Sequence, residues 1–355
     1  YAIMCGVGPS ISVLKKRAKD LTKLLLPFEP TEMIDALNSS KKNKLFKNVH
    51  SLHFFPLGGI EASAAFAKNI NVLTYEFENI DTKALEELDL FVSMRPSVKA
   101  LKISQDRLTE KSYLNSLGIK TTQFYRIDGV SDIEELFVKL KKPMLIKTRR
   151  LGYDGKGQVL IKTQDDINEH YLGKKIFPSI AEEVISFDKE LSVIIVRDKE
   201  GNIKTFEPGE NVHKKGILVT TTLPSSTSEV LKNDAVTIAR KIVANLDYIG
   251  VMGVEFFLKE NELYVNEIAP RVHNSGHWTM DGSYSSQFQQ HIRAIMDLPL
   301  LSTERHSDII MYNLIGKVTS KLANNELAKV YVYGKEDSRP GRKMGHINLI
   351  KKKGS

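Results

Sequence analysis

The sequence predicts a mixed α/β protein with α+β character, and three observations support this fold class. Strand-like apolar runs alternate with helical patterns through residues 1–96, as expected for an open, Rossmann-like parallel sheet. Two β-rich runs flank a glycine-rich loop between Pro143 and Lys162. The alternation of apolar and polar residues from Val254 to Ile268 is typical of a β-hairpin. We therefore expect a parallel-sheet domain followed by a domain rich in hairpins.

Length and composition are those of a globular protein with several domains. The chain has 355 residues, of which 41% are hydrophobic and 26% charged, and its net charge is +8. We predict domains at residues 1–96, 97–299 and 300–355, the second divided near residue 180 and the third small and β-rich. The excess of positive charge favours anionic partners, either nucleic acid or phosphorylated small molecules.

Neither a membrane span nor a secretory signal is predicted. No apolar run approaches the ~20 residues that a transmembrane helix needs, and the first residues lack the order of a signal peptide. The single cysteine, Cys5, cannot form a disulfide within the chain, which agrees with a reducing compartment. The sequence therefore predicts a cytoplasmic protein that does not bind membranes.

The first domain opens with an apolar strand, Tyr1–Cys5, a glycine turn and a basic helix, Ile11–Leu26. The turn, Gly6-Val7-Gly8-Pro9-Ser10, lacks the third glycine of a dinucleotide fingerprint, so we expect a packing turn and not a cofactor site. The other predicted elements are strands at Leu24–Phe28, Ser51–Phe55 and Val72–Phe77 and helices at Glu61–Ala67 and Thr82–Leu88.

The second domain begins with predicted helices at Ser97–Leu117 and Asp132–Leu140. The glycine-rich stretch after them, Gly152–Gln158, leads into a strand and not a helix, which excludes a Walker P-loop. We interpret it as a flap whose backbone N–H groups approach phosphate oxygens, with Lys147 and Arg149 directed at the same anion. A plain basic hairpin is the alternative.

Strands predicted at Ser179–Ile185 and Leu191–Val196 border a bend that is rich in glutamate. An extended backbone can bond an adenine edge and a nearby carboxylate can accept ribose hydroxyls, although solvated surface glutamates explain the pattern as well. His213 lies in a polar segment predicted to be a loop, where a lone histidine is more often structural than catalytic. A helix, Ser228–Leu246, then leads into the hairpin.

The hairpin contains two glutamates that we expect to face each other. With an odd-length turn centred on Asn261, Glu255 and Glu267 fall opposite each other on one face of the two strands. Opposed like charges repel, so a cation is expected between them. Two carboxylates beside the Asn266 amide are ligands suited to Mg²⁺. A solvated hairpin face is the alternative.

Two further loops add cationic and polar side chains. The loop Ala269–Trp278 contains a cation, two imidazoles and an amide directly after the second strand, which favours a functional site over a solvated face. After a predicted helix at Ser285–Leu298, a basic turn lies within Tyr333–His346. Arginine and lysine together suit a phosphate monoester, and a solvated basic turn is the alternative.

Taken together, these stretches resemble one family of ATP-grasp ligases, the N5-carboxyaminoimidazole ribonucleotide synthetases, which form the ATPase subunit of phosphoribosylaminoimidazole carboxylase. The resemblance covers nearly the whole chain and is most specific in two strings, RRLGYDGKGQ at residues 149–158 and NEIAPRVHNSGHW at residues 266–278. It also includes the segments Thr74–Asn79, Gln105–Leu108, Asn211–His213 and Arg339–Lys343.

The resemblance implies an ATP-grasp fold with a Rossmann-like N-terminal domain and a small C-terminal domain. The implied reaction is the ATP-dependent carboxylation of 5-aminoimidazole ribonucleotide by bicarbonate, through carboxyphosphate, in purine biosynthesis. Mg²⁺ is the implied cofactor, as two ions that Mn²⁺ can replace, and the implied assembly is a homodimer.

Residue roles also follow from the resemblance. The ATP-binding residues would be Arg107, Lys147, Gly152, Tyr153, Asp154, Gly155, Lys156, Gly157, Gln158, Glu182, Glu183, Val184, Ile185, Glu190, His213, Asn266 and Glu267. Glu255 and Glu267 would bind the metal. The residues around bicarbonate and the reacting amine would be Arg271, His273, Asn274, Asp154 and Tyr153, and Glu76, Lys335, Arg339 and Arg342 would bind the ribonucleotide.

Two other functions remain open at this point. Another ATP-grasp carboxylate–amine ligase would share the ATP-binding half and activate a different acid. A nucleic-acid-binding protein would need a stripe of basic residues with stacking aromatics, whereas the charges here cluster at phosphate-sized turns.

Overall fold

The computed structural model describes residues 71–152, 155–171, 177–318, 321–335 and 337–351. Contacts group the chain into two compact units, Tyr1–Leu73 with Asp81–Met94 and Thr74–Ile80 with Arg95–Ser355. The boundaries of the three predicted domains stay predictions. Outside the described residues lie Tyr153, Asp154 and the elements predicted before residue 71, namely the strands Tyr1–Cys5, Leu24–Phe28 and Ser51–Phe55, the glycine turn and the helices Ile11–Leu26 and Glu61–Ala67.

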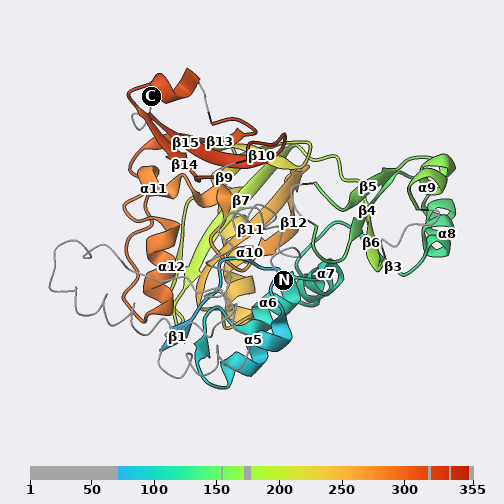
Figure 1. Ribbon diagram of the computed structural model, residues 1–355, viewed down its shortest axis with the longest axis horizontal. Helices are drawn as coiled ribbons and strands as arrows, with labels where there is room; N and C mark the ends of the chain where they lie inside the picture. Colours follow the sequence, from blue (N-terminus) through green and yellow to red (C-terminus); the bar gives the residue numbers. More distant parts are fainter. Residues whose placement is uncertain (1–70, 153–154, 172–176, 319–320, 336, 352–355) are drawn as a thin grey trace, which may run out of the picture. The chain divides into compact units, whose positions relative to one another are not determined.

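In the first unit, β1 (Val72–Leu73) and β2 (Ser93–Met94) pair in parallel, and α5 (Thr82–Asp89) lies between them in the chain (Figure 1). Asp81 caps α5 by accepting a hydrogen bond from the Lys83 N–H at 3.0 Å. The parallel pairing agrees with the predicted sheet. The strand ends at Leu73 and is shorter than the predicted Val72–Phe77, and the chain from Thr74 to Ile80 groups with the second unit.

The second unit contains two antiparallel sheets (Figure 1). The larger has the strand order β12-β11-β7-β9-β10-β13-β15-β14, with β8 paired to β7 and with β12 and β14 at its edges. Its strands are β7 (Lys189–Arg197), β8 (Ile203–Thr205), β9 (Gly209–Lys214), β10 (Ile217–Leu223), β11 (Gly250–Lys259), β12 (Glu262–Ala269), β13 (Asp308–Ile315), β14 (Ala328–Val332) and β15 (Lys343–Lys351).

The smaller sheet has the order β3-β6-β4-β5. Its strands are β3 (Phe124–Ile127), β4 (Met144–Thr148), β5 (Gln158–Ile161) and β6 (Ser179–Glu183), and two helices, α8 (Val130–Leu140) and α9 (Gln164–Tyr171), accompany it. Ile133 of α8 and Ile167 of α9 are fully buried in the core of this sheet. β4 and β5 flank the glycine flap, as predicted.

The helix predicted over Ser97–Leu117 is in fact two helices, α6 (Val98–Ser104) and α7 (Arg107–Ser116). The break falls at Gln105, whose side-chain amide donates to the carbonyl groups of Glu78 and Ile80, both at 2.6 Å. Asp106 then caps the start of α7 with its carboxylate. Polar side chains that bind nearby backbone groups compete with a continuous helix, which explains the difference.

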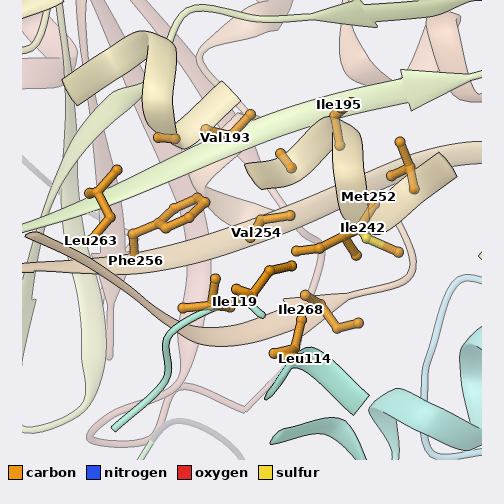
Figure 2. Close-up of a cluster of buried hydrophobic side chains, with 14 of the residues drawn as sticks. Leu114, Ile119, Val193, Ile195, Ile242, Met252, Val254, Phe256, Leu263 and Ile268 are labelled. Atoms are coloured by element: carbon orange, nitrogen blue, oxygen red, sulfur yellow. The ribbon is translucent and has the colours of Figure 1, made fainter. Parts of the chain in front are cut away.

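One face of the larger sheet is closed by α10 (Glu229–Asn245). Figure 2 shows the buried side chains of this core, including Val193 and Ile195 of β7, Met252, Val254 and Phe256 of β11, Leu263 and Ile268 of β12, Ile242 of α10, and Leu114 and Ile119. Alternate residues of the same strands point to the opposite face, where Ile194 and Val251 pack with Ala294 of α12 (Gln287–Ile295) and with Trp278. Glu190 and Glu255 belong to that second face, called here the site face.

Three short helices complete the described part of the second unit: η3 (Asn274–Gly276), α11 (Thr279–Gly282) and η4 (Lys321–Asn324). Among the described helices, none combines the length and the apolar character that crossing a bilayer requires.

Candidate active site

Glu255 on β11 and Glu267 on β12 lie directly opposite each other, as predicted. The predicted odd-length turn was wrong. β11 and β12 are joined by Glu260 and Asn261, which both have positive φ (50° and 64°), as in a two-residue type I′ turn. That turn alone would place Glu255 opposite Asn266, but the pairing shifts by one residue next to Glu255. A β-bulge at Asn266 therefore creates the glutamate pair.

The bulge turns two consecutive side chains of β12 to the site face. Leu263, Val265 and Ile268 are buried in the core, at a spacing of two and then three residues. Asn266 and Glu267 occupy the wider interval and are only half-buried. An amide and a carboxylate from β12 therefore accompany the Glu255 carboxylate from β11.

The glutamate pair fits a divalent cation. Burial and the neighbouring Glu267 raise the pKa of Glu255 to about 7, so the second charge of the pair is hard to accommodate without a further cation. Two carboxylates and an amide oxygen are the hard donors that Mg²⁺ and Mn²⁺ prefer. Among the described residues, no group of three or more His, Cys, Asp or Glu side chains forms a fuller metal cage. Mg²⁺ does not need one, because it completes its shell with water and substrate phosphates.

Positive charge is concentrated beside this pair. Arg107 Nη1 lies 3.3 Å from Glu267 Oε2, and Lys147 Nζ lies 3.0 Å from Glu182 Oε2. A second lysine, Lys111, has its Nζ 3.5 Å from the same oxygen of Glu182. Burial would raise the pKa of Glu182, but the two lysines outweigh it and lower that pKa to about 2. The cations outnumber the ionised carboxylate between them, as a phosphate-binding site requires.

Arg149 does not face the same anion as Lys147, so this prediction was wrong. The Nε and Nη2 atoms of Arg149 donate to the two carboxylate oxygens of Asp106 at 2.9 and 2.7 Å. Two-point pairs of this kind are strong and orient both partners. Because Asp106 caps α7, Arg149 attaches the smaller sheet to the start of that helix.

Glu190 and His213 form a pair on the site face, with Glu190 Oε2 and His213 Nδ1 at 2.8 Å. His213 lies within β9 and not in the predicted loop, because the chain from Gly209 to Lys214 pairs with both β7 and β10. Burial lowers the pKa of His213, but Glu190 and Glu255 outweigh burial and raise it overall.

An aromatic pair lies next to Glu190. Phe257 of β11 is the direct neighbour of Glu190 across the sheet, and the ring of Phe187 stacks on it with the centroids 4.6 Å apart. Phe187 lies in the segment between β6 and β7, which also contains Val184 and Ile185, and it is 42% exposed. This stack offers a flat apolar surface beside a carboxylate, which suits a planar base with an attached sugar.

The described ends of the flap are anchored. Arg107 Nη2 donates to the Gly152 carbonyl at 3.4 Å, and the Thr148 N–H donates to the Gly157 carbonyl at 2.8 Å. Gly155 has a φ of +76°, and a Cβ there would lie 2.8 Å from the carbonyl oxygen of Lys215 in the β9–β10 turn. Glycine is therefore needed for the flap to contact that turn. Lys156 is exposed beside it, and Gln158 pairs with Lys147.

Arg271, in the loop after β12, is bound by Glu78. Its Nη2 donates to Glu78 Oε1 at 2.8 Å and its Nε donates to the other oxygen. Glu78 belongs to the segment in which Glu76 was predicted to bind substrate, and Glu76 itself is exposed. The segment therefore contributes an arginine-binding carboxylate, Glu78, that was not among the predicted site residues.

His273 is buried against β11. A Cβ at Gly253 would lie 2.7 Å from the Cβ of His273, so the missing side chain makes room for the imidazole. His273 Nδ1 contacts Ser275 Oγ at 2.8 Å and Nε2 lies 3.6 Å from Glu255 Oε1. Burial, reinforced by Arg271, lowers the pKa of His273 well below its usual value, so the ring is neutral.

Asn274 forms a reciprocal amide pair with Asn313 of β13. Asn274 Nδ2 donates to Asn313 Oδ1 at 2.9 Å, and Asn313 Nδ2 donates to Asn274 Oδ1 at 2.7 Å. Gln287 of α12 holds the same loop by bonding the N–H and the carbonyl of His273 at 2.9 and 2.7 Å. Asn313 and Gln287 were not predicted, because neither lies in a recognisable motif.

The basic turn between β14 and β15 binds its own backbone in this structure. Lys335 Nζ donates to the Lys343 carbonyl at 2.8 Å, and Arg342 Nη1 donates to the Asp337 carbonyl at 3.0 Å, while Arg339 is exposed. Burial and Glu267 raise the pKa of Glu255 overall, and the charge of Lys343 opposes that rise. For His273, burial and Arg271 lower the pKa, and Lys343 acts in the same direction. The turn thus extends its positive field to the site face.

Glu110 and Lys111 of α7 were also missed. Their side chains are 2% and 1% exposed, and they line the same region as Arg107. A signal for them exists in the sequence, because positions three and four residues after Arg107 share its helix face.

Comparison with known proteins identifies the family. Residues 57–105 match the ribonucleotide synthetase preATP-grasp domain, residues 112–288 the ATP-grasp domain, and residues 310–355 the phosphoribosylaminoimidazole carboxylase C-terminal domain. The chain is 45% identical over 298 residues to the N5-carboxyaminoimidazole ribonucleotide synthase of Brucella melitensis, covering 82% of each chain.

Solved structures agree. The N5-carboxyaminoimidazole ribonucleotide synthetase of Thermus thermophilus has a TM-score of 0.76 at 39% identity, covering 82% of this chain and 80% of its own. The Aspergillus clavatus synthase in complex with ADP and 5-aminoimidazole ribonucleotide has a TM-score of 0.77 at 31% identity, covering 89% of this chain and 90% of its own. The predicted ATP-grasp fold and family are confirmed: the chain belongs to the N5-carboxyaminoimidazole ribonucleotide synthase family of ATP-grasp ligases.

Proposed function

We propose that this protein joins bicarbonate to the amino group of 5-aminoimidazole ribonucleotide at the expense of ATP, giving N5-carboxyaminoimidazole ribonucleotide, ADP and phosphate in purine biosynthesis. The name of the Brucella melitensis relative states this activity, and the Aspergillus clavatus relative binds ADP together with 5-aminoimidazole ribonucleotide. The observation that carries the proposal is the Glu255–Glu267 pair beside Arg107 and Lys147.

Glu255 and Glu267, with the Asn266 amide, would hold one or two Mg²⁺ ions, and Mn²⁺ could replace them. When bound, these ions neutralise charge on the phosphate oxygens during transfer. Arg107 and Lys147 add fixed positive charge at the same place.

The nucleotide is assigned to the site face. Lys147 and Arg107 bind its phosphates, and the flap from Gly152 to Gln158 covers them and excludes water. Glu190 accepts ribose hydroxyls, and His213 orients the Glu190 carboxylate through their hydrogen bond. The base would lie by the segment after β6 and the Phe187–Phe257 stack.

The chemistry proceeds in two steps. Bicarbonate oxygen attacks the γ-phosphorus of ATP, which gives carboxyphosphate and ADP. The amine of the ribonucleotide then attacks the carboxyphosphate carbon, phosphate leaves and the amine loses a proton. Arg271 stabilises the developing carboxylate charge, and neutral His273 is in the protonation state to accept the proton. Asn274, Tyr153 and Asp154 complete this subsite, and Glu76, Lys335, Arg339 and Arg342 bind the ribonucleotide.

The test is phosphate release from Mg-ATP by the purified protein. We expect release only when both bicarbonate and 5-aminoimidazole ribonucleotide are present, with label from ¹⁴C-bicarbonate in an acid-labile product. Release that needs bicarbonate and a different amine, with no response to the ribonucleotide, would identify another ATP-grasp carboxylate–amine ligase. A salt-sensitive complex with RNA or DNA and no ATP turnover would support the nucleic-acid alternative.

The family resemblance further predicts a homodimer in the cytoplasm. Light scattering of the purified protein at micromolar concentration measures the oligomeric state. Microscopy of the tagged protein in its own cells measures its location.

A further inference from the structure

One face of α7 holds three consecutive residues of β12. Lys111 Nζ donates to the Asn266 carbonyl at 3.3 Å, and Arg107 Nη1 donates to Glu267 Oε2 at 3.3 Å. Glu110 Oε1 accepts a hydrogen bond from the Ile268 N–H at 2.7 Å. Residues three and four positions apart share a helix face, so all three side chains reach β12 from one direction.

The residues that α7 holds are those of the bulge. β12 is an edge strand, and among the described residues the pairing on its outer side is a single bridge between Thr121 and Val265, one residue before the bulge. Glu110 and Lys111 provide partners for two further backbone groups of β12, one on each side of Glu267 along the chain. Buried backbone groups need such partners, and a bulge held on both sides cannot slip to the regular register.

Stability alone does not explain these two side chains. Both are almost completely buried, and an apolar pair of similar size is often as stable as buried polar or charged groups. Leu114, one turn further along α7, already packs in the core with Ile268 (Figure 2). The hydrogen bonds from Glu110 and Lys111 specify which backbone atoms of β12 lie against α7, which apolar packing alone does not do.

Lys111 also connects the bulge with the smaller sheet. Its Nζ donates to Thr122 Oγ1 at 3.2 Å and lies 3.5 Å from Glu182, the carboxylate that holds Lys147. The same lysine therefore contacts the strand that bears Glu267 and the carboxylate that orients a phosphate-binding cation.

We propose that Glu110 and Lys111 are positioning residues, which lock the bulge of β12 so that Glu267 faces Glu255 and both can bind a metal–nucleotide complex. They act through β12 and do not touch the nucleotide. This inference rests on the proposed function, because it requires the Glu255–Glu267 pair to bind the divalent ion. Loss of a residue that orients metal ligands typically weakens metal binding about 10- to 100-fold.

The experiment measures Mn²⁺ binding in the presence of ADP, by the electron paramagnetic resonance signal of free Mn²⁺. We expect Lys111→Met and Glu110→Met to weaken Mn²⁺ binding about 10-fold or more. Glu110→Gln is the conservative variant, since its amide oxygen can still accept the Ile268 N–H, and it should stay within about threefold of wild type. Burial raises the pKa of Glu110 to about 8, which favours the neutral carboxyl. The neutral amide of glutamine resembles that form.

Lys232→Met is the matched control. Lys232 is another buried lysine, 6% exposed and paired with Glu229 and Glu207, and it lies in α10 outside the site. It should bind Mn²⁺ as wild type does. Circular dichroism identifies the variants that fold. Each folded methionine variant tests the inference independently. Lys111→Gln is a milder change and replaces Lys111→Met if that variant does not fold.

The inference is overturned if the folded methionine variants bind Mn²⁺ within twofold of wild type. It is also overturned if Glu110→Gln and Lys232→Met lose as much Mn²⁺ affinity as Glu110→Met and Lys111→Met. A wild-type protein that does not bind Mn²⁺ with ADP would instead refute the proposed function itself. The two failures are therefore distinguishable.

Discussion

At the scale of single residues, the site contains two glutamates, Glu255 and Glu267, whose surroundings shift their pKa values in opposite directions. Burial and Glu267 raise the pKa of Glu255 to about 7. Burial acts in the same direction on Glu267, but Arg107 and Lys147 outweigh it and keep its pKa below the usual range. Glu267 is therefore the more readily ionised member of the pair, and its charge is the one that a bound cation and the arginine would share.

Replacing Glu267 with glutamine removes that charge at nearly constant shape. We expect Glu267→Gln to lower kcat/KM for the carboxylation at least about 100-fold, because a charged group at the transferring phosphate is lost. The fold should remain, since the change relieves repulsion with Glu255. Steady-state kinetics and thermal unfolding measure both effects.

Glu262→Gln is the control in the same strand. Glu262 is exposed and pairs at 2.7 Å with Lys120 on the surface, so its loss should change neither activity nor stability measurably. Turnover by Glu267→Gln within threefold of wild type would contradict the metal-binding role.

At the scale of elements, the flap and the β9–β10 turn depend on each other. Gly216 has a φ of +74°, and a Cβ there would lie 2.7 Å from the Cα of Gly155 in the flap. The two backbones can approach this closely because both positions are glycine. The turn therefore gives the smaller sheet a contact point on the larger one.

Gly216→Ala should hold the flap away from this turn. We expect the KM for ATP to rise about 10-fold and protease cleavage near the flap to accelerate, because a displaced flap no longer covers the phosphates. Gly201→Ala is the control: its φ of +86° imposes similar backbone strain, but its Cβ would meet only Arg197 Nη2 at 3.7 Å. Equal KM values for the two variants would refute this role of the turn.

Several elements could be predicted from the sequence for physical reasons. The period-two alternation of apolar and polar residues predicted the β11–β12 hairpin. The glycine-rich stretch between two β-rich runs predicted the flap between β4 and β5. The bulge was missed although its signal is present, since the apolar positions Leu263, Val265 and Ile268 change from a spacing of two to three. The break between α6 and α7 was not predictable, because Gln105 bonds carbonyl groups in a distant segment.

At the scale of the whole molecule, the family motifs predicted the fold class and the activity, while the strand order and the partners of each charge came only with the tertiary structure. Lys147 was predicted to bind phosphate, and its carboxylate partner Glu182 lies 35 positions away. The Asp106 partner of Arg149 is 43 positions away. Local patterns cannot identify such pairs, so Arg149 was predicted to face an anion although its partner is Asp106.

Acid should destabilise the second unit through His291. Its Nδ1 accepts the Val251 N–H at 3.0 Å, and burial lowers its pKa to about 4. Above about pH 6.5 the ring is neutral in both the folded and the unfolded chain. As the pH falls from there to about 4, the unfolded chain binds a proton that the folded chain excludes, so the free energy of unfolding decreases by up to about 3 kcal/mol.

Urea unfolding of wild type and His291→Gln at pH 7.5 and pH 5 measures this effect. Glutamine can still accept the Val251 N–H and does not titrate, so the variant should lose less stability than wild type between the two pH values. An identical loss in both proteins would show that other groups govern the acid response.

The contact between α7 and β12 contains a backbone amide whose hydrogen exchange reports how often the helix and the strand separate. The Ile268 N–H is buried against Glu110, so it can exchange with solvent deuterium only when the helix separates from the strand. Its exchange rate therefore measures how often the metal-binding hairpin loses its support, in a protein that holds neither nucleotide nor metal. Slow exchange at this one amide would mean that the site is assembled before its substrates arrive.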